Sequence, residues 1–172
     1  MGCVAMDEEG EILFVNQTLW KGEKVGGYRD SGGKKLGNKT TTLEFAGIII
    51  PFLLYPEMFK GQCVLVQVDN ISCHFAWENG YCKENNTASI LVRVLVLLCA
   101  KLECEITIVH LPRETTWESR LVDRLSREKT TKGQEKKLLD SFEKRKLPKV
   151  FEDWMCDPFE DWGLATKIVN VI

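Results

Sequence analysis

The amino-acid sequence predicts an α/β fold in which helices cover a mixed sheet. Its 172 residues can bury a sizeable core, and a content of 44% hydrophobic and 28% charged residues is typical of a globular protein. Short β-branched segments alternate along the chain with longer apolar segments of helical length. The formal net charge of −2 gives no overall basic field, so a nucleic-acid partner would have to bind a local patch.

The first third of the chain predicts β structure. Segments 2–6 and 11–20 are rich in Val, Ile, Phe and Leu, and residues 7–10 between them, Asp-Glu-Glu-Gly, predict a hairpin turn. Residues 21–40 are rich in glycine and lysine, which predicts a loop with one short edge strand near 25–28.

A long apolar helix is expected next. Thr40, Thr41 and Thr42 offer N-cap oxygens to a helix that starts near Leu43 and runs to about residue 55. This segment is apolar almost all round, so we expect it to be buried on most sides, with a kink at Pro51.

The middle of the chain alternates between strand and helix. Residues 62–68 form a valine-rich run that ends in Asp69-Asn70, a pattern typical of a strand buried on both faces. We then predict a helix over 71–84 that ends near Gly80, a helix over 88–102 capped at 85–87, a strand over 104–109, and a helix over 117–128.

The chain divides by charge after this last helix. We predict a domain over 1–128, a basic helical linker over 129–149, and an acidic, aromatic tail over 150–172. Two interpretations of the last two segments stay open. They form either a flexible basic helix followed by a free aromatic segment, or a solvated helix followed by a tail that docks on the domain.

The cysteines and the apolar segments bear on the compartment. Seven cysteines are present without a CxxC pair, and they are typical of reduced thiols rather than of a zinc site. The longest apolar runs, 45–55 and 90–100, are much shorter than the roughly 20 residues of a membrane span. We expect an intracellular protein, cytoplasmic or nuclear, with no targeting segment and no membrane partner.

Three carboxylates lie at positions where a charged side chain has a high free-energy cost. Glu44 is within an apolar helix, Asp69 follows a buried strand, and Asp123 lies one helical step from the apolar face of the 117–128 helix. If they converge, they need a counter-charge, and hard oxygen ligands with open water positions suit Mg²⁺. Each also has a plain structural explanation: a charge at a helix N-terminus, a turn and cap, and a surface partner for neighbouring arginines.

The order of these acids and their surroundings resembles the ribonuclease H domain of retroelement (LTR-type) reverse transcriptases. The resemblance spans residues 1 to about 128. It rests on four segments: Thr42-Leu-Glu-Phe-Ala46, Val64-Leu-Val-Gln-Val-Asp-Asn70, Ile106-Thr-Ile-Val-His-Leu-Pro-Arg113 and Leu121-Val-Asp-Arg-Leu-Ser-Arg127. They match the family's helix glutamate, the "DN" that ends its fourth strand, the His-x-Pro after its fifth strand, and its closing "AD-x-LSR" helix.

The resemblance implies a five-stranded mixed sheet flanked by helices and hydrolysis of RNA in RNA–DNA hybrids with Mg²⁺, or Mn²⁺ in its place. It implies that Glu44, Asp69 and Asp123 bind the metal, and that His110 assists product release or water activation. By itself His110 would be a plain loop residue at a strand end. The implied partners are an RNA–DNA hybrid and the reverse transcriptase portion of a polyprotein.

The chain also departs from the family pattern. The family has its first aspartate in a central first strand resembling "TDAS". Segment 2–6 matches the family's second strand, which would put the first strand before Met1; alternatively, segment 2–6 is the first strand and Asp7 its aspartate. Further departures are an insertion between His110 and Asp123, Ser119 in place of asparagine, and Val122 in place of alanine.

We therefore expect a ribonuclease H-like domain whose activity is weak or absent without the first aspartate. The alternatives are a non-catalytic ribonuclease H-like module that binds nucleic acid or a protein, and an unrelated α/β protein with incidental acids. Basic residues in two segments could contact phosphates or could form solvated faces. They are Lys21, Lys24, Arg29, Lys34, Lys35 and Lys39 in the early loop, and Arg113, Arg120, Arg124 and Arg127 near the last helix.

Overall fold

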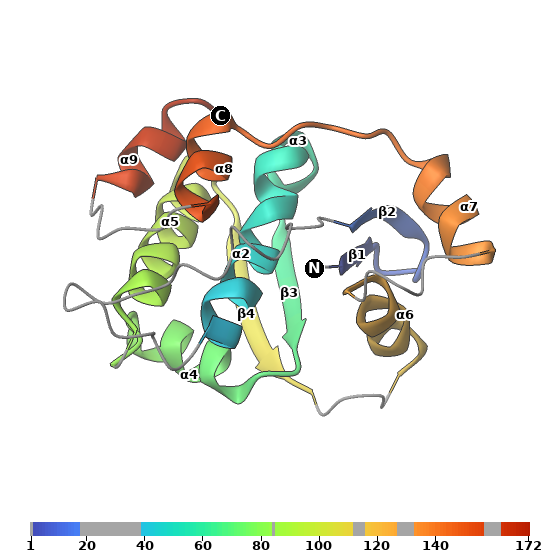
Figure 1. Ribbon diagram of the computed structural model, residues 1–172, viewed down its shortest axis with the longest axis horizontal. Helices are drawn as coiled ribbons and strands as arrows, with labels where there is room; N and C mark the ends of the chain where they lie inside the picture. The colour runs from blue at the N-terminus through green and yellow to red at the C-terminus, as the bar shows by residue number, and fades with distance from the viewer. Residues whose placement is uncertain (1, 18–38, 84, 112–115, 127–132, 157–162) are drawn as a thin grey trace. The chain divides into compact units, whose positions relative to one another are not determined.

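The computed structural model describes residues 2–17, 39–83, 85–111, 116–126, 133–156 and 163–172 (Figure 1). The chain forms two compact units. One unit comprises Met1–Trp20 with Pro112–Lys146, and the other comprises Lys21–Leu111 with Leu147–Ile172. The predicted edge strand near 25–28 lies outside the described residues.

The first unit contains the predicted hairpin. β1 (Gly2–Met6) pairs antiparallel with β2 (Ile12–Gln17), so that Val4 lies opposite Val15. The Asp7 carboxylate accepts the backbone N–H groups of Glu9 and Glu11 at 3.1 and 2.8 Å, and Gly10 has a φ of 85°. An aspartate that bonds amides further along the turn and a glycine with positive φ are the usual chemistry of such turns, and the hairpin prediction is confirmed.

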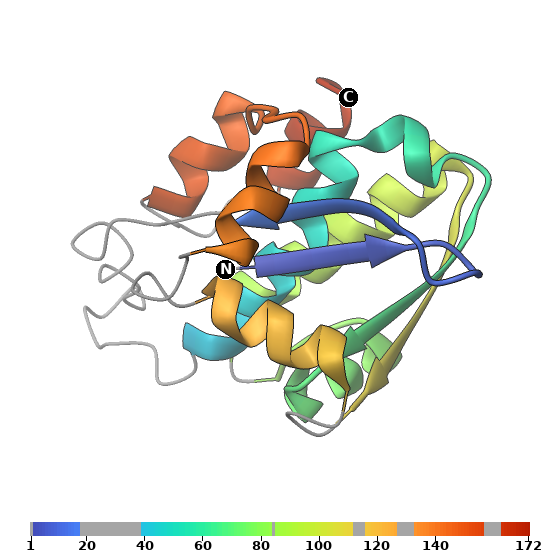
Figure 2. The same ribbon diagram turned by 90° about the vertical axis from the view of Figure 1, so that its right-hand side faces the viewer.

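Two helices pack on this hairpin. α6 (Trp117–Ser126) lies alongside β1, as Figure 2 shows, and α7 (Gln134–Ser141) contacts β2. As the spacing predicts, Leu121 and Leu125 lie on one face of α6, and with Val15 they form a small buried core. The Thr116 hydroxyl accepts the Ser119 N–H at 3.3 Å and caps α6.

The second unit is built on a parallel strand pair. β3 (Cys63–Val68) and β4 (Glu105–His110) run side by side, and the chain passes between them through α4 (Ile71–Asn79) and α5 (Asn86–Leu102). α4 ends at Gly80, whose φ is 75°, and the Asn85 side chain accepts the Ala88 N–H at the start of α5. Both helix boundaries agree closely with the prediction.

The long apolar helix differs at its start. α2 (Lys39–Leu54) begins at Lys39 instead of near Leu43, and a short helix, α3 (Pro56–Phe59), follows it. The threonines therefore lie within the first turns of α2. Thr41 and Thr42 are fully buried, with exposed fractions of 0% and 1%. Their hydroxyls bond side chains of other elements, so the backbone can continue the helix through them.

The prediction that β3 is buried on both faces is wrong. Its residues alternate in exposure, and Leu65 is 61% exposed. The described helices of this unit cover one face of the parallel pair, where Ile108 of β4 is only 1% exposed. A valine-rich run indicates a strand but does not by itself tell how many faces are covered.

The end of the chain packs onto this unit. α8 (Lys149–Cys156) and α9 (Leu164–Val169) contact each other, and α9 packs on α5. Phe151, Trp154 and Ile168 are at most 2% exposed. These contacts favour the interpretation of a docked tail, whereas the predicted domain boundaries stay a prediction.

The protein is thus of the α/β class. In the part of the chain that the structure describes, the strands form two separate two-stranded sheets, one antiparallel and one parallel, instead of one continuous mixed sheet. None of the described helices combines the length and the apolar character that crossing a membrane would require.

Candidate functional site

The candidate site lies at the carboxyl-terminal edge of the parallel pair. Val68 and His110 are register partners at this edge, and the Leu111 N–H donates to the Val68 carbonyl at 2.9 Å. Asp69 comes directly after Val68 and is exposed, and His110 is half-buried. The structure therefore puts Asp69 and His110 at the same end of two adjacent strands, where open α/β sheets hold ligands.

Helix α2 reaches the same edge through two contacts. The Asn70 side-chain amide donates to the Thr41 hydroxyl at 3.4 Å. One turn further along α2, a carboxylate oxygen of Glu44 accepts the Cys73 thiol at 3.5 Å. Because Cys73 is in the first turn of α4, directly after Asp69-Asn70, Glu44 and Asp69 belong to one neighbourhood.

Electrostatics link these two acids to the same thiol. Cys73 is fully buried, and burial raises the pKa of its thiol far above the usual range. The Glu44 charge and its hydrogen bond raise this pKa further, as do the charges of Cys82 and Asp69. The thiol thus stays protonated at neutral pH and donates to Glu44, and the potential around it is negative.

A buried polar network fixes α2 against α5. The Asn85 amide donates to the Thr42 hydroxyl at 2.9 Å, while its carbonyl oxygen accepts the Ala88 N–H at 2.9 Å. Asn85 is 3% exposed. It therefore does more than the predicted capping, because it also joins two helices that are far apart in the sequence. Sequence reasoning could predict the cap but not the partner.

His74 is a second residue that sequence reasoning missed. Its Nδ1 lies 2.8 Å from the Ile108 carbonyl oxygen, which can only accept, so Nδ1 carries the proton. In the neutral imidazole the other nitrogen, Nε2, is then the acceptor. Nothing in its sequence surroundings distinguishes His74 from a surface helix residue, since the anchoring carbonyl comes from a strand more than thirty residues later.

Two further acids have different surroundings. Asp123 is half-buried on α6, in the hairpin unit, while Glu44, Asp69 and His110 are in the unit of the parallel pair. Asp7, the alternative first aspartate, lies exposed in the hairpin turn, where its carboxylate accepts two backbone N–H groups. The Asp7 carboxylate therefore stabilises the turn.

A metal site was expected, and two groups of basic residues were interpreted either as phosphate contacts or as solvated faces. Over the described ranges, no group of three or more His, Cys, Asp and Glu side chains could hold a metal ion. Of these basic residues, Arg120 and Arg124 are exposed on α6, and Lys39 is the first residue of α2. Arg113, Arg127 and the loop residues 21–35 lie outside the described residues. The Mg²⁺ site stays a prediction.

Comparisons with models of known protein families, with curated proteins and with solved structures find no match to this chain.

Proposed function

We propose that the chain is a ribonuclease H-like domain of a retroelement reverse transcriptase. Domains of this kind hydrolyse RNA in RNA–DNA hybrids by two-metal catalysis, and the activity of this chain is weak or absent. The observation that carries the proposal is the neighbourhood of Glu44 and Asp69. At the carboxyl-terminal edge of the parallel pair, Glu44 accepts a hydrogen bond from the buried Cys73 thiol, and the charges of Glu44 and Asp69 both raise the pKa of this thiol. Nucleases of this chemistry need carboxylates from different elements at one point.

The strand pairing supports the same proposal. The resemblance implies a sheet whose central first strand separates an antiparallel hairpin from a parallel pair. The described strands form an antiparallel pair and a parallel pair of this kind.

The donor set fits a hard divalent cation. Glu44 and Asp69 offer carboxylate oxygens, and the charges of both acids favour the protonated form of the neighbouring thiol. With Asp123 added from the resemblance, these residues would hold Mg²⁺ or Mn²⁺. The bound ions would supply an activated water and stabilisation of the leaving oxygen.

The side chains around the acids orient them. The Cys73 thiol donates to one oxygen of Glu44 and so orients this carboxylate. The contact from Asn70 to Thr41 fixes the turn that carries Asp69 against α2. His110, at the rim of the same edge, is proposed to exchange a proton with water or product.

Titration with Mg²⁺ tests the proposal without requiring activity. We expect saturable changes in the amide NMR signals of Glu44, Asp69 and Cys73. We also expect a lower Cys73 pKa, because a cation opposes the charges that raise it. Asp69→Asn and Glu44→Gln should abolish both effects and any cleavage of a hybrid, whereas Glu78→Gln, on exposed α4 surface, should change neither. Mg²⁺ effects that persist in Asp69→Asn would refute the site.

One observation favours a second function, a non-catalytic module that binds nucleic acid or the reverse transcriptase portion of a polyprotein. The described part of this edge brings together two carboxylates, fewer than a two-metal site uses. Binding of an RNA–DNA hybrid that is equally tight with Mg²⁺ and with a chelator, with no cleavage in either, would favour this module over the enzyme.

A further inference from the structure

An open cleft of about 610 Å³ lies in the unit of the parallel pair, between the loop after α4 and the outer face of α5. Its volume is in the range of small-molecule sites. The side chains that matter for its chemistry are Tyr81, Lys83, Asn86, Arg93, Val96 and Leu97. Glu44, Asp69 and His110 do not line it, so the cleft is separate from the carboxylate site.

Helix α5 presents a single narrow strip to this cleft. The helix is otherwise buried almost all round, with Leu91, Val94 and Leu95 at 0% exposure. Asn86, Arg93 and Val96 are exposed or partly exposed, and their spacing of seven and three residues puts them on one helix face. Arg93 is the one charge on this strip.

The described lining residues of the cleft include two cations, Lys83 and Arg93. Lys83 and Arg93 are both exposed, and neither forms an ion pair with another of the described residues. The other described lining residues include no acid. Two exposed cations beside one cleft favour an anion, and the planar guanidinium of Arg93 can bind a phosphate through two hydrogen bonds.

Flat apolar surface lies next to these cations. Tyr81 is 55% exposed and Val96 is 46% exposed, so a ring and an aliphatic side chain face the solvent at the same cleft. An exposed tyrosine ring beside phosphate-binding cations is the combination on which nucleobases stack. An acidic peptide would satisfy the cations but would not need the ring.

We propose that this cleft binds a nucleoside phosphate, with the phosphate on Arg93 and Lys83 and the base on Tyr81. The ligand is either a free nucleotide or one nucleotide of a single strand, since both present the same chemistry. The inference does not depend on metal binding at Glu44 and Asp69, and it is tested in the presence of a chelator so that the two proposals fail separately.

The test is an NMR and calorimetric titration of the whole chain with adenosine monophosphate. We expect saturable binding with signal changes at Tyr81, Arg93 and Val96, and weaker binding of adenosine and of inorganic phosphate alone. Arg93→Gln should weaken binding about tenfold, as expected for loss of a charge-assisted contact. Tyr81→Ala should weaken it to a similar extent, while Tyr81→Phe keeps the ring and should bind normally.

Lys60→Gln is the matched control, because it removes an exposed cation of the same unit outside the cleft. An unstructured single-stranded oligonucleotide distinguishes the two sources. If the oligonucleotide binds more tightly than the mononucleotide and Arg93→Gln weakens its binding, the cleft is assigned to single strands. If the oligonucleotide and the mononucleotide bind equally per nucleotide, the cleft is assigned to free nucleotides. Absence of saturable binding, equal binding of inorganic phosphate, or equal losses in Arg93→Gln and Lys60→Gln would overturn the proposal.

Discussion

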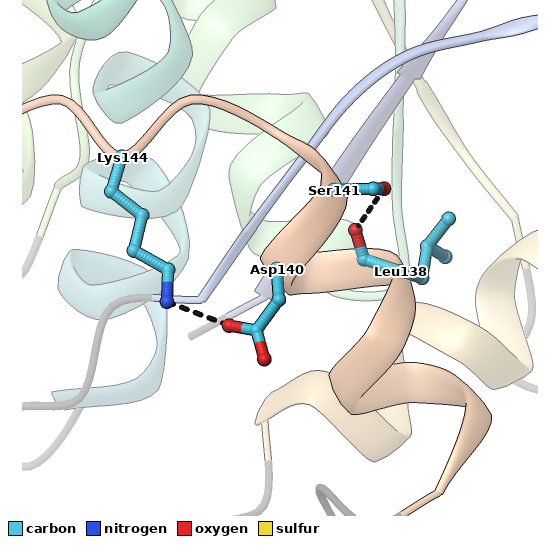
Figure 3. Close-up of polar contacts among 4 residues, drawn as sticks. All are labelled: Leu138, Asp140, Ser141 and Lys144. Carbon is cyan, nitrogen blue, oxygen red and sulfur yellow. Dashed lines mark hydrogen bonds and ion pairs between the residues drawn. The ribbon is translucent and has the colours of Figure 1, made fainter.

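The hydrogen bonds of polar groups differ in burial and in sequence separation between the neighbourhood of Glu44 and the end of α7. Around Glu44 the bonds are buried and join residues far apart in the sequence, as between Thr42 and Asn85. At the end of α7 they are exposed and local: Lys144 pairs with Asp140 at 2.7 Å, and the Ser141 hydroxyl donates to the Leu138 carbonyl (Figure 3).

This difference determines what each bond contributes. A buried polar group that loses its partner cannot recover the lost bond from water, whereas an exposed group can. The pair at the end of α7 also joins residues only four positions apart in the sequence, Asp140 in the helix and Lys144 in the extended segment after it. We therefore expect the first region to hold the tertiary structure and the second to contribute mainly to surface charge.

The largest expected effect is that of Asn85→Ala. The substitution removes the cap of α5 and leaves the buried Thr42 hydroxyl without this donor. The free energy of unfolding should fall by about 2–3 kcal/mol, measured by denaturant titration. Asn79→Ala is the control, because Asn79 bonds a carbonyl one turn back on an exposed surface, and its effect should stay within about 0.5 kcal/mol. Equal losses in both variants would break the comparison.

Gly2→Ala tests how far the hairpin unit depends on the close packing of α6 on β1. A Cβ on Gly2 would collide with the Leu125 Cβ and approach the Val122 carbonyl oxygen at 3.0 Å. We expect a loss of about 1–3 kcal/mol, because the contact atoms belong to the helix and cannot rotate away. NMR signals of β1 and α6 should shift while those of α5 do not. Unchanged stability would show that α6 packs less closely on β1.

These regions also differ in how far the sequence predicts them. Local chemistry predicted the Asp7 turn, the Asn85 cap, the Gly80 stop and the Leu121–Leu125 face, since each depends on residues a few positions apart. It failed for the start of α2, because the hydroxyls of Thr41 and Thr42 find partners that are distant in sequence. It also failed for β3, since coverage of a strand depends on elements packed elsewhere along the chain.

The candidate site was predictable in part for the same reason. The sequence predicted Asp69 at the end of a strand and singled out Glu44 as a charge within an apolar helix. The strand register that puts Asp69 beside His110 is known only from the structure. No local pattern pointed to the Cys73 thiol, because a cysteine in an apolar helix is usually inert core. Its contact with Glu44 exists only once α4 has docked against α2.

The pH dependence of stability sharpens the comparison. Burial and the Glu44 charge raise the pKa of Cys73, so above its ordinary value of 9.0 the unfolded chain loses this proton first. Stability is then fully present below about pH 9.0 and falls as the pH rises further. Cys73→Ala should make this alkaline decline shallower in denaturant titrations across the pH range. Cys63→Ala, at an exposed strand position, should leave the decline unchanged. An identical slope in wild type and Cys73→Ala would contradict the assignment.

The smallest effect is expected at α7, at the opposite end of the pH scale. The hydrogen bond and charge of Lys144 lower the pKa of Asp140 below its ordinary value of 3.8. Any stability from this pair is present above that value and is lost as the pH falls through the lowered pKa. Because both side chains are exposed, Lys144→Gln should raise the Asp140 pKa in an NMR titration without a detectable change in the unfolding midpoint. Lys149→Gln breaks another exposed pair, with Asp153, and should leave the Asp140 titration unchanged. If Lys144→Gln instead destabilised the protein as much as Asn85→Ala, burial would not be what separates the two regions, and the exposed end of α7 would have to be regarded as part of the structural core.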